Sequence, residues 1–525
     1  MPEPLSRHTR YAMQWRASCN VKKNEFFFAI PLVCSTFAEK RRFADAKIIN
    51  CFDLDIDKTL KISEFANRVI EACCFTPTAD QRYALDTFGH FLADRAPENV
   101  MILRGSAGTG KTSLAAAIVK TLHSLGQKEQ LLAPTGRAAK VFALHSGQPA
   151  STIHRRIYRQ KAFAGDFNLN DNLHTHTLFI VDEASMVSAT PADGSSFGSN
   201  GLLEDLIRYV YSGNGCRLML IGDKAQLPPV GEEESPALTA SVLAGYGLRV
   251  WQCDLNEVVR QDARSGILWN ATMLRQLITH DTATEMPQIR LEGFPDITVM
   301  PGADLTEAIA GSYSSVGIDE TMVITRSNKT ANIYNMGIRN MVLDREAELS
   351  VGDLLIIVKN KYITLPDGKT AFIANGDRAR VVRVRRQREF YDFHFADAVL
   401  TFPDYDDFEL ETTVLLDTLH SDAPALTREQ SELLYNKVME DYADIGRKSE
   451  RLQRLKEDVY FNALQVKYAY AVTCHKAQGG QWAHVYIDQG YMTDDTLTPD
   501  YIHWLYTAFT RATEKLFLVN WPIKK

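Results

Sequence analysis

A glycine-rich segment that ends in a lysine and a threonine, residues 105–112, follows the apolar run Val100 to Leu103 and precedes a helical pattern from Ser113 to Leu125. This order of strand, loop and helix is the one a phosphate-binding loop requires. Glycines let backbone N–H groups converge on phosphate oxygens, the lysine reaches the β- and γ-phosphates, and the threonine hydroxyl ligates Mg²⁺. The flanking elements disfavour a turn without a ligand. We assign to a nucleotide the residues Gly105, Ser106, Ala107, Gly108, Thr109, Gly110, Lys111 and Thr112.

Two adjacent carboxylates, Asp182 and Glu183, end the apolar run Leu178 to Val181. Open α/β sheets bind ligands at the carboxyl ends of their strands. Transfer of a γ-phosphoryl group needs charge neutralisation and an oriented water molecule more than covalent chemistry. We therefore predict that Asp182 ligates Mg²⁺ together with Thr112, and that Glu183 polarises the attacking water. The alternative is a solvated acidic turn.

The elements that must position these residues are indicated by the alternation of apolar runs and helical patterns from about Ala96 onward, which is typical of a parallel sheet covered by helices. Closely spaced runs between Asp353 and Phe402, with the turn signal Asn375-Gly376, predict a small antiparallel barrel. A charged helix is expected from about Arg447 to Val466, after which the α/β pattern returns. A barrel inserted in an α/β lobe is the simplest organisation.

The length of 525 residues indicates two or more structural units. A net charge of −7 is usually taken to argue against a nucleic-acid partner. Between Asp397 and Asp444, however, 13 acidic residues face 2 basic ones, a balance of −11, so the rest of the chain sums to +4. The acidity is local, and a solvated acidic face explains it. The whole-chain charge therefore does not exclude nucleic acid.

Cysteine usage and hydropathy bear on the compartment. The eight cysteines include no Cys-x-x-Cys pair and no histidines clustered at metal-ligand spacing, which favours reduced thiols. The longest apolar run, Phe26 to Cys34, has nine residues, whereas a membrane helix needs roughly 18. We expect a cytoplasmic protein with no membrane partner.

Six further segments resemble the motifs of superfamily 1 helicases, specifically the RecD-like and Dda-like branch. Their order and spacing match from about residue 75 to residue 520. The segments are Leu132 to Lys140 (motif Ia), Ser151 to His154 (the next DNA-contacting segment), Ile221 to Val230 (motif III), Leu255 to Gln261 (motif IV), Tyr470 to Gly479 (motif V) and Tyr506 to Ala512 (motif VI).

The resemblance implies an α/β fold with two RecA-like parallel-sheet lobes, a β-hairpin pin inserted in the first lobe and an SH3-like β-barrel inserted in the second. Mg²⁺-ATP would bind between the lobes. The expected divisions are an N-terminal extension (1–70), the first lobe (71–250, with the pin at about 155–177), the first part of the second lobe (251–350), the barrel with an acidic and helical insertion (351–466) and the last part of the second lobe (467–525).

The same resemblance implies roles around the nucleotide. Arg260 and Arg511 would act as arginine fingers from the second lobe, although an isolated arginine is more often part of a surface ion pair. Gln226 would sense the γ-phosphate, and Gln478 and Gly479 would contact the nucleotide. Gln81 is similar to the family's adenine-reading glutamine, but a helix-capping turn explains its surroundings equally well.

For DNA the family implies contacts to single-strand phosphates, with a loop at His475-Lys476 between the DNA and the nucleotide. A buried structural histidine is the alternative for each histidine. In the pin, Phe163 or Phe167 would stack on the last base pair or, alternatively, anchor the hairpin. The implied contacts are Pro134, Thr135, Arg137, Thr152, His154, Thr325, Asn328, Thr473 and His475.

The first seventy residues lie outside the resemblance. Asp53, Asp55, Asp57 and Glu64 have the spacing of a calcium-binding EF-hand loop. Lys58 stands where that loop needs a glycine, so an acidic turn before a helix is the better interpretation. The segment is expected to be an extension or an arm that docks a protein partner.

These features lead to the hypothesis of an ATP- and Mg²⁺-dependent DNA helicase that moves on single-stranded DNA, 5′ to 3′, and separates duplex junctions. The polarity comes from the resemblance alone. The alternatives are a 3′ to 5′ translocase of the UvrD-like branch and a non-catalytic DNA-binding subunit with a vestigial nucleotide site.

Overall fold

The computed structural model describes residues 58–73, 75–160, 167–191, 201–257, 265–279, 287–364, 370–405, 407–492 and 498–522. Several predictions fall on positions beyond these ranges. They concern Arg260, Phe163, Asp53, Asp55, Asp57 and the side chains of Phe167 and Lys58.

The first lobe is a six-stranded parallel sheet in the order β3-β2-β6-β7-β1-β8. Helices cover both faces of the sheet, and successive apolar residues of a strand point to opposite faces. In β1, Met101 and Leu103 face one helical layer, and Val100 and Ile102 face the other. The strands are β1 (Asn99–Gly105), β2 (Lys128–Ala133), β3 (Ala150–Thr152), β6 (Thr177–Val181), β7 (Arg217–Gly222) and β8 (Arg249–Leu255). The helices are α3 (Lys58–Ala72), α4 (Ala79–Ala93), α5 (Lys111–Ser124) and α6 (Gly136–Ser146) for the first layer, and α7 (Ile153–Ile157), α8 (Leu202–Ser212) and α9 (Ala240–Gly245) for the second.

Two predicted boundaries of this lobe are wrong. Ile62, Phe65 and Val69 recur on one face of α3 and are buried against the lobe, so residues 58–70 belong to the first lobe rather than to an extension. Glu64 lies on the exposed face of α3 and pairs with Arg68 at 2.6 Å. At the other end, β8 pairs along its whole length with β1, which carries the first lobe to Leu255 instead of residue 250.

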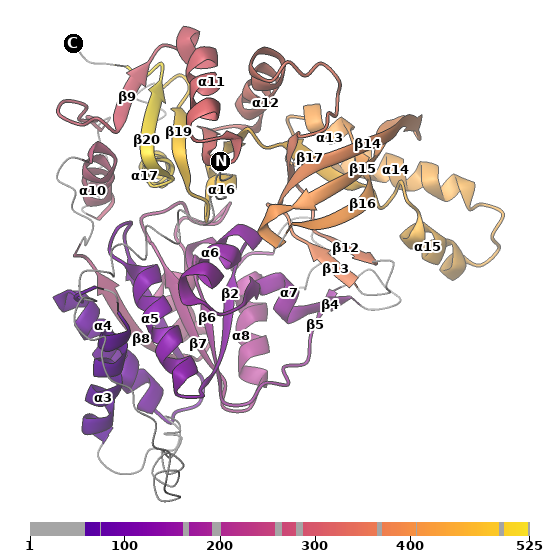
Figure 1. Ribbon diagram of the computed structural model, residues 1–525. Helices are drawn as coiled ribbons and strands as arrows, with labels where there is room; N and C mark the ends of the chain where they lie inside the picture. The colour runs from indigo at the N-terminus through magenta and orange to yellow at the C-terminus, as the bar shows by residue number, and fades with distance from the viewer. Residues whose placement is uncertain are drawn as a thin grey trace, which may run out of the picture.

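The second lobe has a five-stranded parallel sheet in the order β18-β10-β19-β20-β9. Figure 1 shows it beside the first lobe, with the carboxyl-terminal segment folded back into it. Its strands are β9 (Ile297–Met300), β10 (Thr321–Thr325), β18 (Ala471–Thr473), β19 (Trp482–Asp488) and β20 (Ala512–Val519), and its helices are α10 (Gly266–Thr279), α11 (Leu305–Ser315), α12 (Asn328–Gly337), α16 (Cys474–Ala477) and α17 (Pro499–Phe509). The prediction of two RecA-like lobes is confirmed.

A closed five-stranded barrel interrupts the second lobe, as predicted. All of its pairings are antiparallel except that of β16 with β17. A separate hairpin of two strands, β12 and β13, projects from it. The bounds are β11 (Leu354–Ile357), β12 (Lys361–Thr364), β13 (Thr370–Ile373), β14 (Arg378–Phe390), β15 (Phe393–Phe402), β16 (Phe408–Leu415), α13 (Asp417–His420), α14 (Arg428–Asp441), α15 (Lys448–Glu457) and β17 (Leu464–Tyr468).

The prediction of a helix from about Arg447 to Val466 is wrong for the second half of this segment. α15 ends at Glu457, and Asp458 accepts backbone N–H groups of Tyr460 and Phe461 at 2.9 and 2.8 Å, which turns the chain. The following residues form the buried strand β17, which pairs with β11 and closes the barrel up to Tyr468. Burial in the barrel therefore overrides the helical tendency of this segment.

Short elements complete the chain. At the predicted position of the pin, β4 (Tyr158–Gln160) pairs antiparallel with β5 (Phe167–Leu169). The 3₁₀ and π turns are Ala184–Met186, Pro236–Leu238, Gly302–Asp304, Ile318–Glu320, Ile338–Val342 and Pro403–Tyr405. In Figure 1 the hairpin β12–β13 lies beside this pin, between the barrel and the first lobe.

The barrel is fixed to both lobes. On the second lobe, the guanidinium of Arg339 donates to both oxygens of Asp353 at 3.1 and 3.0 Å, and both side chains are buried. On the first lobe, Gly136 at the start of α6 lies so close to the barrel that a Cβ there would stand 2.6 Å from the Tyr405 hydroxyl and 2.7 Å from Asp377. The barrel therefore spans the two lobes.

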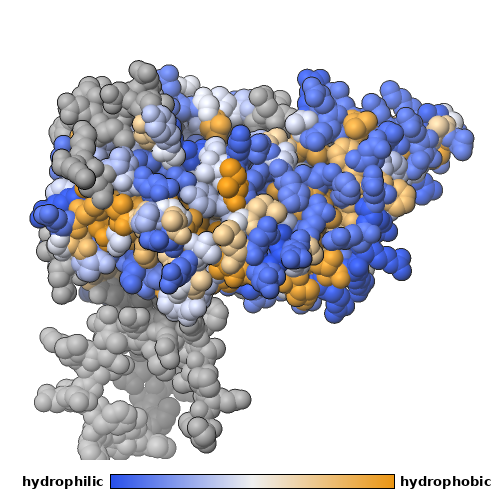
Figure 2. Space-filling model, turned by 90° about the horizontal axis from the view of Figure 1, so that it is seen from above, coloured by the Kyte–Doolittle hydropathy of each residue, from blue (hydrophilic) through white to orange (hydrophobic). Residues whose placement is uncertain are grey.

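The surface differs between the two ends of the molecule. Seen from above, the end that holds the barrel and the helices α14 and α15 is covered largely by hydrophilic side chains (Figure 2). Among the described residues, every helix is too short or too polar to span a membrane. Cys73, Cys216, Cys253 and Cys474, the cysteines within the described ranges, are free thiols.

Candidate nucleotide and nucleic-acid sites

The glycine-rich segment forms a loop between the end of β1 and the start of α5. Gly108 and Gly110 have φ values of 81° and 80°, a left-handed conformation that favours glycine. Lys111 lies over the loop, where its ammonium donates to the Ser106 carbonyl at 2.9 Å, and the Thr109 hydroxyl donates to the same carbonyl at 2.8 Å. The loop thus presents its backbone at a helix N-terminus, the arrangement that binds phosphate.

Asp182 and Glu183 leave β6 beside this loop. The Thr112 hydroxyl lies 3.5 Å from Asp182 Oδ2, so the two predicted Mg²⁺ ligands face each other. Burial, together with the Glu183 charge, raises the pKa of Asp182 to about 7. A hydroxyl and a carboxylate are the hard oxygen donors that Mg²⁺ prefers, so these residues fit the ion. Glu183 has φ 53°, ψ 37°, a left-handed conformation that costs on the order of 1–3 kcal/mol at a non-glycine residue and is typical of functional sites.

Gln81 connects the phosphate loop to α4. Its side-chain oxygen accepts the Thr78 N–H at 3.1 Å in a capping box, and its Nε2 donates to the Thr109 carbonyl at 2.9 Å. Both ends of this buried amide are engaged, which is the arrangement expected of the capping turn. Contact with adenine stays a prediction.

Two second-lobe side chains that the sequence analysis missed reach the phosphate loop. The Tyr506 hydroxyl on α17 accepts the Ala107 N–H at 2.9 Å and donates to Asp223 at 2.6 Å. Arg275 on α10 donates to the Ser106 hydroxyl at 2.5 Å. Tyr506 and Asp223 lie in segments resembling motifs VI and III, which could have singled them out. Arg275 lies in none of these segments.

Arg511 is not brought to the phosphate loop. Its buried guanidinium donates within the second lobe, to the carbonyls of Thr507 and Gly480 and to the Thr510 hydroxyl, each at 3.1 Å. Among the described arginines of the second lobe it is Arg275 that touches the loop. The role of Arg511 as an arginine finger stays a prediction.

The loop that carries Gln226 is held by the second lobe. Leu227 N–H donates to the Thr507 hydroxyl at 2.8 Å, and the Gln478 side chain donates to the Leu227 carbonyl at 2.7 Å. Gln226 is buried, and its side-chain oxygen has no hydrogen-bond partner among the described residues. A buried amide left with a free acceptor suits a sensor that gains a partner when the nucleotide site changes. Gln478 contacts this loop rather than the phosphate loop.

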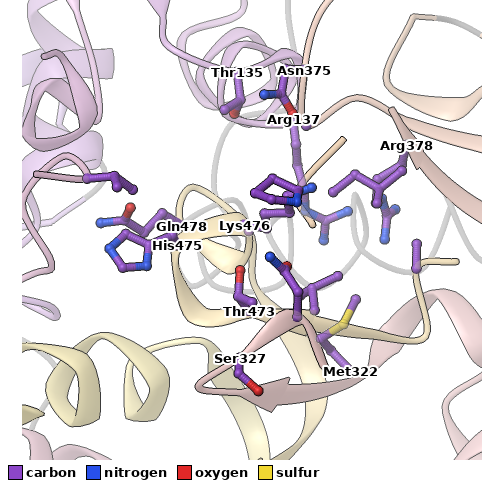
Figure 3. Close-up of a pocket in the computed structure, with 18 of the residues that line it drawn as sticks. Thr135, Arg137, Met322, Ser327, Asn375, Arg378, Thr473, His475, Lys476 and Gln478 are labelled. Carbon is purple, nitrogen blue, oxygen red and sulfur yellow. The ribbon is translucent and has the colours of Figure 1, made fainter. Parts of the chain in front are cut away.

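A cavity of about 720 Å³ lies where the two lobes and the barrel meet. Figure 3 shows Thr135, Arg137 and Asn375 on one side of it and Ser327, Met322 and Thr473 on the other. Of the predicted DNA contacts, five line the cavity, namely Thr135, Arg137, Asn328, Thr473 and His475. Further lining residues that were not predicted as contacts include Lys329, Asn375, Arg378 and Lys476.

The cations of this cavity are desolvated. The Arg137 guanidinium lies 5.0 Å from the Trp482 ring centroid and donates to the Gln481 carbonyl at 2.6 Å. Burial, followed by repulsion from Arg378, lowers its pKa to about 10. Burial likewise lowers the pKa of Lys476 to about 8, and its ammonium has no hydrogen-bond partner in the described structure. Arg378 has Asp404 as a partner at 4.0 Å, whereas the Lys476 ammonium forms no ion pair with a described carboxylate, and a buried cation of that kind favours an anionic ligand.

The other predicted contacts lie outside the cavity lining. Thr152 caps α7 by accepting the Arg155 N–H at 3.2 Å, and Thr325 donates to the Ser327 carbonyl at 3.0 Å. Pro134 is buried just before the cap of α6, and Gly479, with φ 72°, lies against that helix. The His154 ring stacks on Phe372 of the barrel hairpin with centroids 6.2 Å apart, and burial lowers its pKa to about 4. This packing fits the structural alternative for His154, and its contact with DNA stays a prediction.

Replacing Tyr506 with phenylalanine tests the contact between α17 and the phosphate loop. The change removes a hydrogen bond to the buried Asp223 carboxylate and the acceptor of the Ala107 N–H. Such a bond contributes about 1.5–3 kcal/mol, so turnover of ATP is expected to fall at least about tenfold. Steady-state hydrolysis with single-stranded DNA measures it. Tyr501→Phe is the matched control on the same helix, since its hydroxyl bonds Gln489 instead; equal losses in both variants would assign the effect to packing.

Comparisons with known proteins agree with this geometry. A family model described as an AAA domain matches residues 79–293, and one described as a UvrD-like helicase C-terminal domain matches residues 468–519. The ATP-dependent RecD2 DNA helicase of Deinococcus radiodurans is 32% identical over 180 residues, covering 33% of this chain and 21% of that protein. The ATP-dependent DNA helicase dda of Enterobacteria phage T4 is 26% identical over 304 residues, covering 55% of this chain and 64% of that protein.

The chain therefore spans about a fifth of the first of these relatives and under two thirds of the second. Among solved structures, that of the Pif1 helicase from Bacteroides with ADP-AlF3 and single-stranded DNA is 14% identical, covers 86% of this chain and 94% of that one, and has a TM-score of 0.43. The first family match covers the first lobe and extends past α10 of the second lobe, and the second match covers the last part of the second lobe. In both lobes the chain is similar to superfamily 1 helicases of the RecD and Dda type.

Proposed function

We propose that this chain is an ATP-dependent DNA helicase that moves on single-stranded DNA, 5′ to 3′, and separates the duplex ahead of it. The observation that carries the proposal is a connection between the DNA cavity and the nucleotide loop. Gln478 lines the cavity and bonds the Leu227 carbonyl, Leu227 N–H bonds Thr507, and the adjacent Tyr506 bonds Ala107. These hydrogen bonds would therefore transmit a change at the nucleotide to the residues that hold DNA.

At the nucleotide, Lys111 and the loop N–H groups would hold the phosphates, and Thr112 and Asp182 would hold Mg²⁺. The bound ion neutralises charge on the phosphate oxygens. Glu183 lies next to the metal ligand, from where its carboxylate would orient water toward the γ-phosphate. Arg275 already reaches the loop from the second lobe, so closing of the lobes would bring positive charge to the site. These roles suit hydrolysis better than a vestigial site.

At the DNA, the cavity offers the cations that single-strand binders place against phosphates. Arg137 and Lys476 are half-buried cations of its lining, which has residues from both lobes on opposite walls. Phosphate contacts of this kind fix a strand without reading its sequence. Opposite walls on different lobes would alternate their grip as the lobes move. We infer that Phe163 or Phe167 at the pin meets the junction, as a wedge or as an anchor.

Strand displacement on duplexes with a single 5′ or a single 3′ overhang tests the function and its polarity together. Displacement only from the 5′ overhang is expected, because the RecD-like and Dda-like resemblance implies that direction. Displacement only from the 3′ overhang would make the chain a 3′ to 5′ translocase. If neither substrate is opened and DNA leaves ATP hydrolysis unchanged, the chain is not a helicase.

Alanine variants of the pin decide how it acts. Phe163→Ala and Phe167→Ala are each expected to keep DNA-stimulated hydrolysis, since the pin lies away from the nucleotide, and one of them should lose strand displacement. Both activities are measured on the same forked substrate. Unwinding that persists in both variants would rule out a wedge at either position.

A further inference from the structure

A second cavity, of about 1130 Å³, lies on the outer side of the barrel and has no part in the site described above. Its walls come from the start of β12, from β16, from α14 and from the segment between α15 and β17. The inserted helices thus form one wall and the barrel the other. Figure 1 shows α14 and α15 beside the barrel strand β16.

Two lysines of the barrel face this cavity without an acidic partner. Lys359 and Lys361 both line it, and the ammonium of Lys361 donates to the Asn462 side-chain oxygen. No ion pair to either lysine is made by the described carboxylates. Burial, and then repulsion from Lys359, lowers the pKa of Lys361 to about 7. An anion placed between the two ammonium groups would remove this repulsion.

The carboxylates of the same cavity are committed to other partners. Asp397 accepts from Arg388 and from Thr413, Glu411 accepts from Arg385, and Asp458 accepts from Tyr442 and two backbone N–H groups. Glu432 pairs with Arg428. Three of these carboxylates are neutralised by arginines. Asp458 and Glu457, the fifth lining carboxylate, which accepts from Gln453 at 3.4 Å, have no ion pair among the described residues. They are outnumbered by the lining lysines without an ion pair in the described structure, which are Lys359, Lys361 and Lys456.

This cavity adjoins both the pin and the DNA cavity. The backbone N–H of Asn375, which lines the DNA cavity, donates at 2.6 Å to the side chain of Asn360, which lines the second one. The hairpin that begins at Lys361 stacks Phe372 on His154, four residues before β4 of the pin. A strand diverted at the pin, away from the first cavity, would therefore meet the second.

We propose that the cavity between the barrel and the helices α14 and α15 binds the phosphodiester backbone of the displaced DNA strand through Lys359 and Lys361. The inference rests on the proposed helicase function. Holding the displaced strand there would keep the two strands on opposite sides of the Asn360–Asn375 contact and oppose their reannealing behind the pin.

Binding of the full chain to two DNA substrates of equal duplex tests the proposal. One substrate carries only the 5′ tail, and the other is a fork with both tails. The wild-type chain is expected to bind the fork more tightly, and the double variant Lys359→Gln with Lys361→Gln is expected to bind both equally. For the fork, the slope of log affinity against log salt concentration should fall by about 1.4, since each single-strand phosphate contact contributes about 0.7.

A second double variant, Lys437→Gln with Lys448→Gln, is the matched control. It removes the same amount of charge from α14 and α15, the helices of the other wall, at positions outside the cavity lining, and it should keep the preference for the fork. Loss of the preference in both variants, or in neither, overturns the proposal. Hydrolysis stimulated by single-stranded DNA is measured alongside, and its absence in the wild-type chain would instead show that the proposed function fails.

A photo-crosslinker identifies the strand. Benzoylphenylalanine placed at Ser431, a residue of α14 that lines the cavity, is expected to crosslink to the tail that does not enter the first cavity. Crosslinking to the 5′ tail alone would overturn the assignment. Crosslinking to added polyglutamate but to neither tail would also overturn it, because the cavity would then suit an acidic protein segment.

Discussion

Replacement of Lys111 with alanine is expected to lower ATP hydrolysis at least about 10³-fold and to abolish strand displacement. The Lys111 ammonium lies over the phosphate loop, 2.9 Å from the Ser106 carbonyl, where it can turn to the β- and γ-phosphates. A positioned cation that stabilises charge on a transferring phosphoryl group accounts for a rate factor of this size. Steady-state hydrolysis with and without single-stranded DNA, followed by displacement on the 5′-tailed duplex, measures both losses.

Lys120→Ala is the matched control because Lys120 lies on the same helix, α5, with an exposed side chain. It should retain both activities. If Lys111→Ala keeps hydrolysis within tenfold of the wild-type rate, the loop is not the catalytic nucleotide site. If it loses hydrolysis yet still displaces strands, unwinding is not driven by this site, and the path from Gln478 to the loop has no role in coupling.

The parts of the site that could be predicted from sequence are those whose geometry is local. The phosphate loop is one continuous segment between a strand and a helix, so the residue types at 105–112 fix its form. The two RecA-like lobes follow from the alternation of apolar runs and helical patterns for a similar reason. The left-handed backbone of Glu183 carries no such sequence signal, because left-handed residues are mostly glycine or asparagine.

The contacts made across the lobes could not be predicted in this way. Arg275 is one cation on a helix of ordinary pattern, and only the packing of α10 shows that it reaches Ser106. Arg511 shows the converse case. Its motif predicts a contact with the nucleotide, whereas its guanidinium donates to carbonyls of its own lobe. His154 is part of a DNA-contacting motif, yet tertiary packing buries it against Phe372. Side-chain direction at a domain boundary depends on how the domains dock.

The predicted boundaries of strands were wrong where a strand pairs with another that is far away in the sequence. The charged pattern before residue 466 continues smoothly in sequence, and only the need of β11 for a partner makes Leu464–Tyr468 a strand. In the same way β8 belongs to the first lobe because β1 has an open edge there. The residues of a strand carry no local sequence pattern that identifies a hydrogen-bonded partner far away in the sequence.

Glu183→Gln is expected to keep nucleotide binding and to lower hydrolysis by about 10²–10⁴-fold, the range typical of a positioned acid–base group. The change removes the carboxylate charge but preserves the size of the side chain and leaves the proposed metal ligands Thr112 and Asp182 in place. Because ATP would bind without being consumed, the variant should remain in its ATP-bound grip on DNA. Equilibrium binding of a fluorescent ATP analogue and single-turnover hydrolysis separate the two effects.

A glutamate at the opposite end of the sheet provides the control for this variant. Glu98 has φ 59°, close to the 53° of Glu183, and lies exposed just before β1, whereas Glu183 lies just after β6. Glu98→Gln therefore repeats the same chemical change on the same strained backbone, away from the carboxyl ends of the strands, and should hydrolyse ATP at the wild-type rate. Hydrolysis by Glu183→Gln within threefold of wild type would show that another group orients the water. Equal losses in the two variants would show that losing a negative charge at either end of the sheet lowers turnover, and that the carboxylate beside Asp182 has no special role.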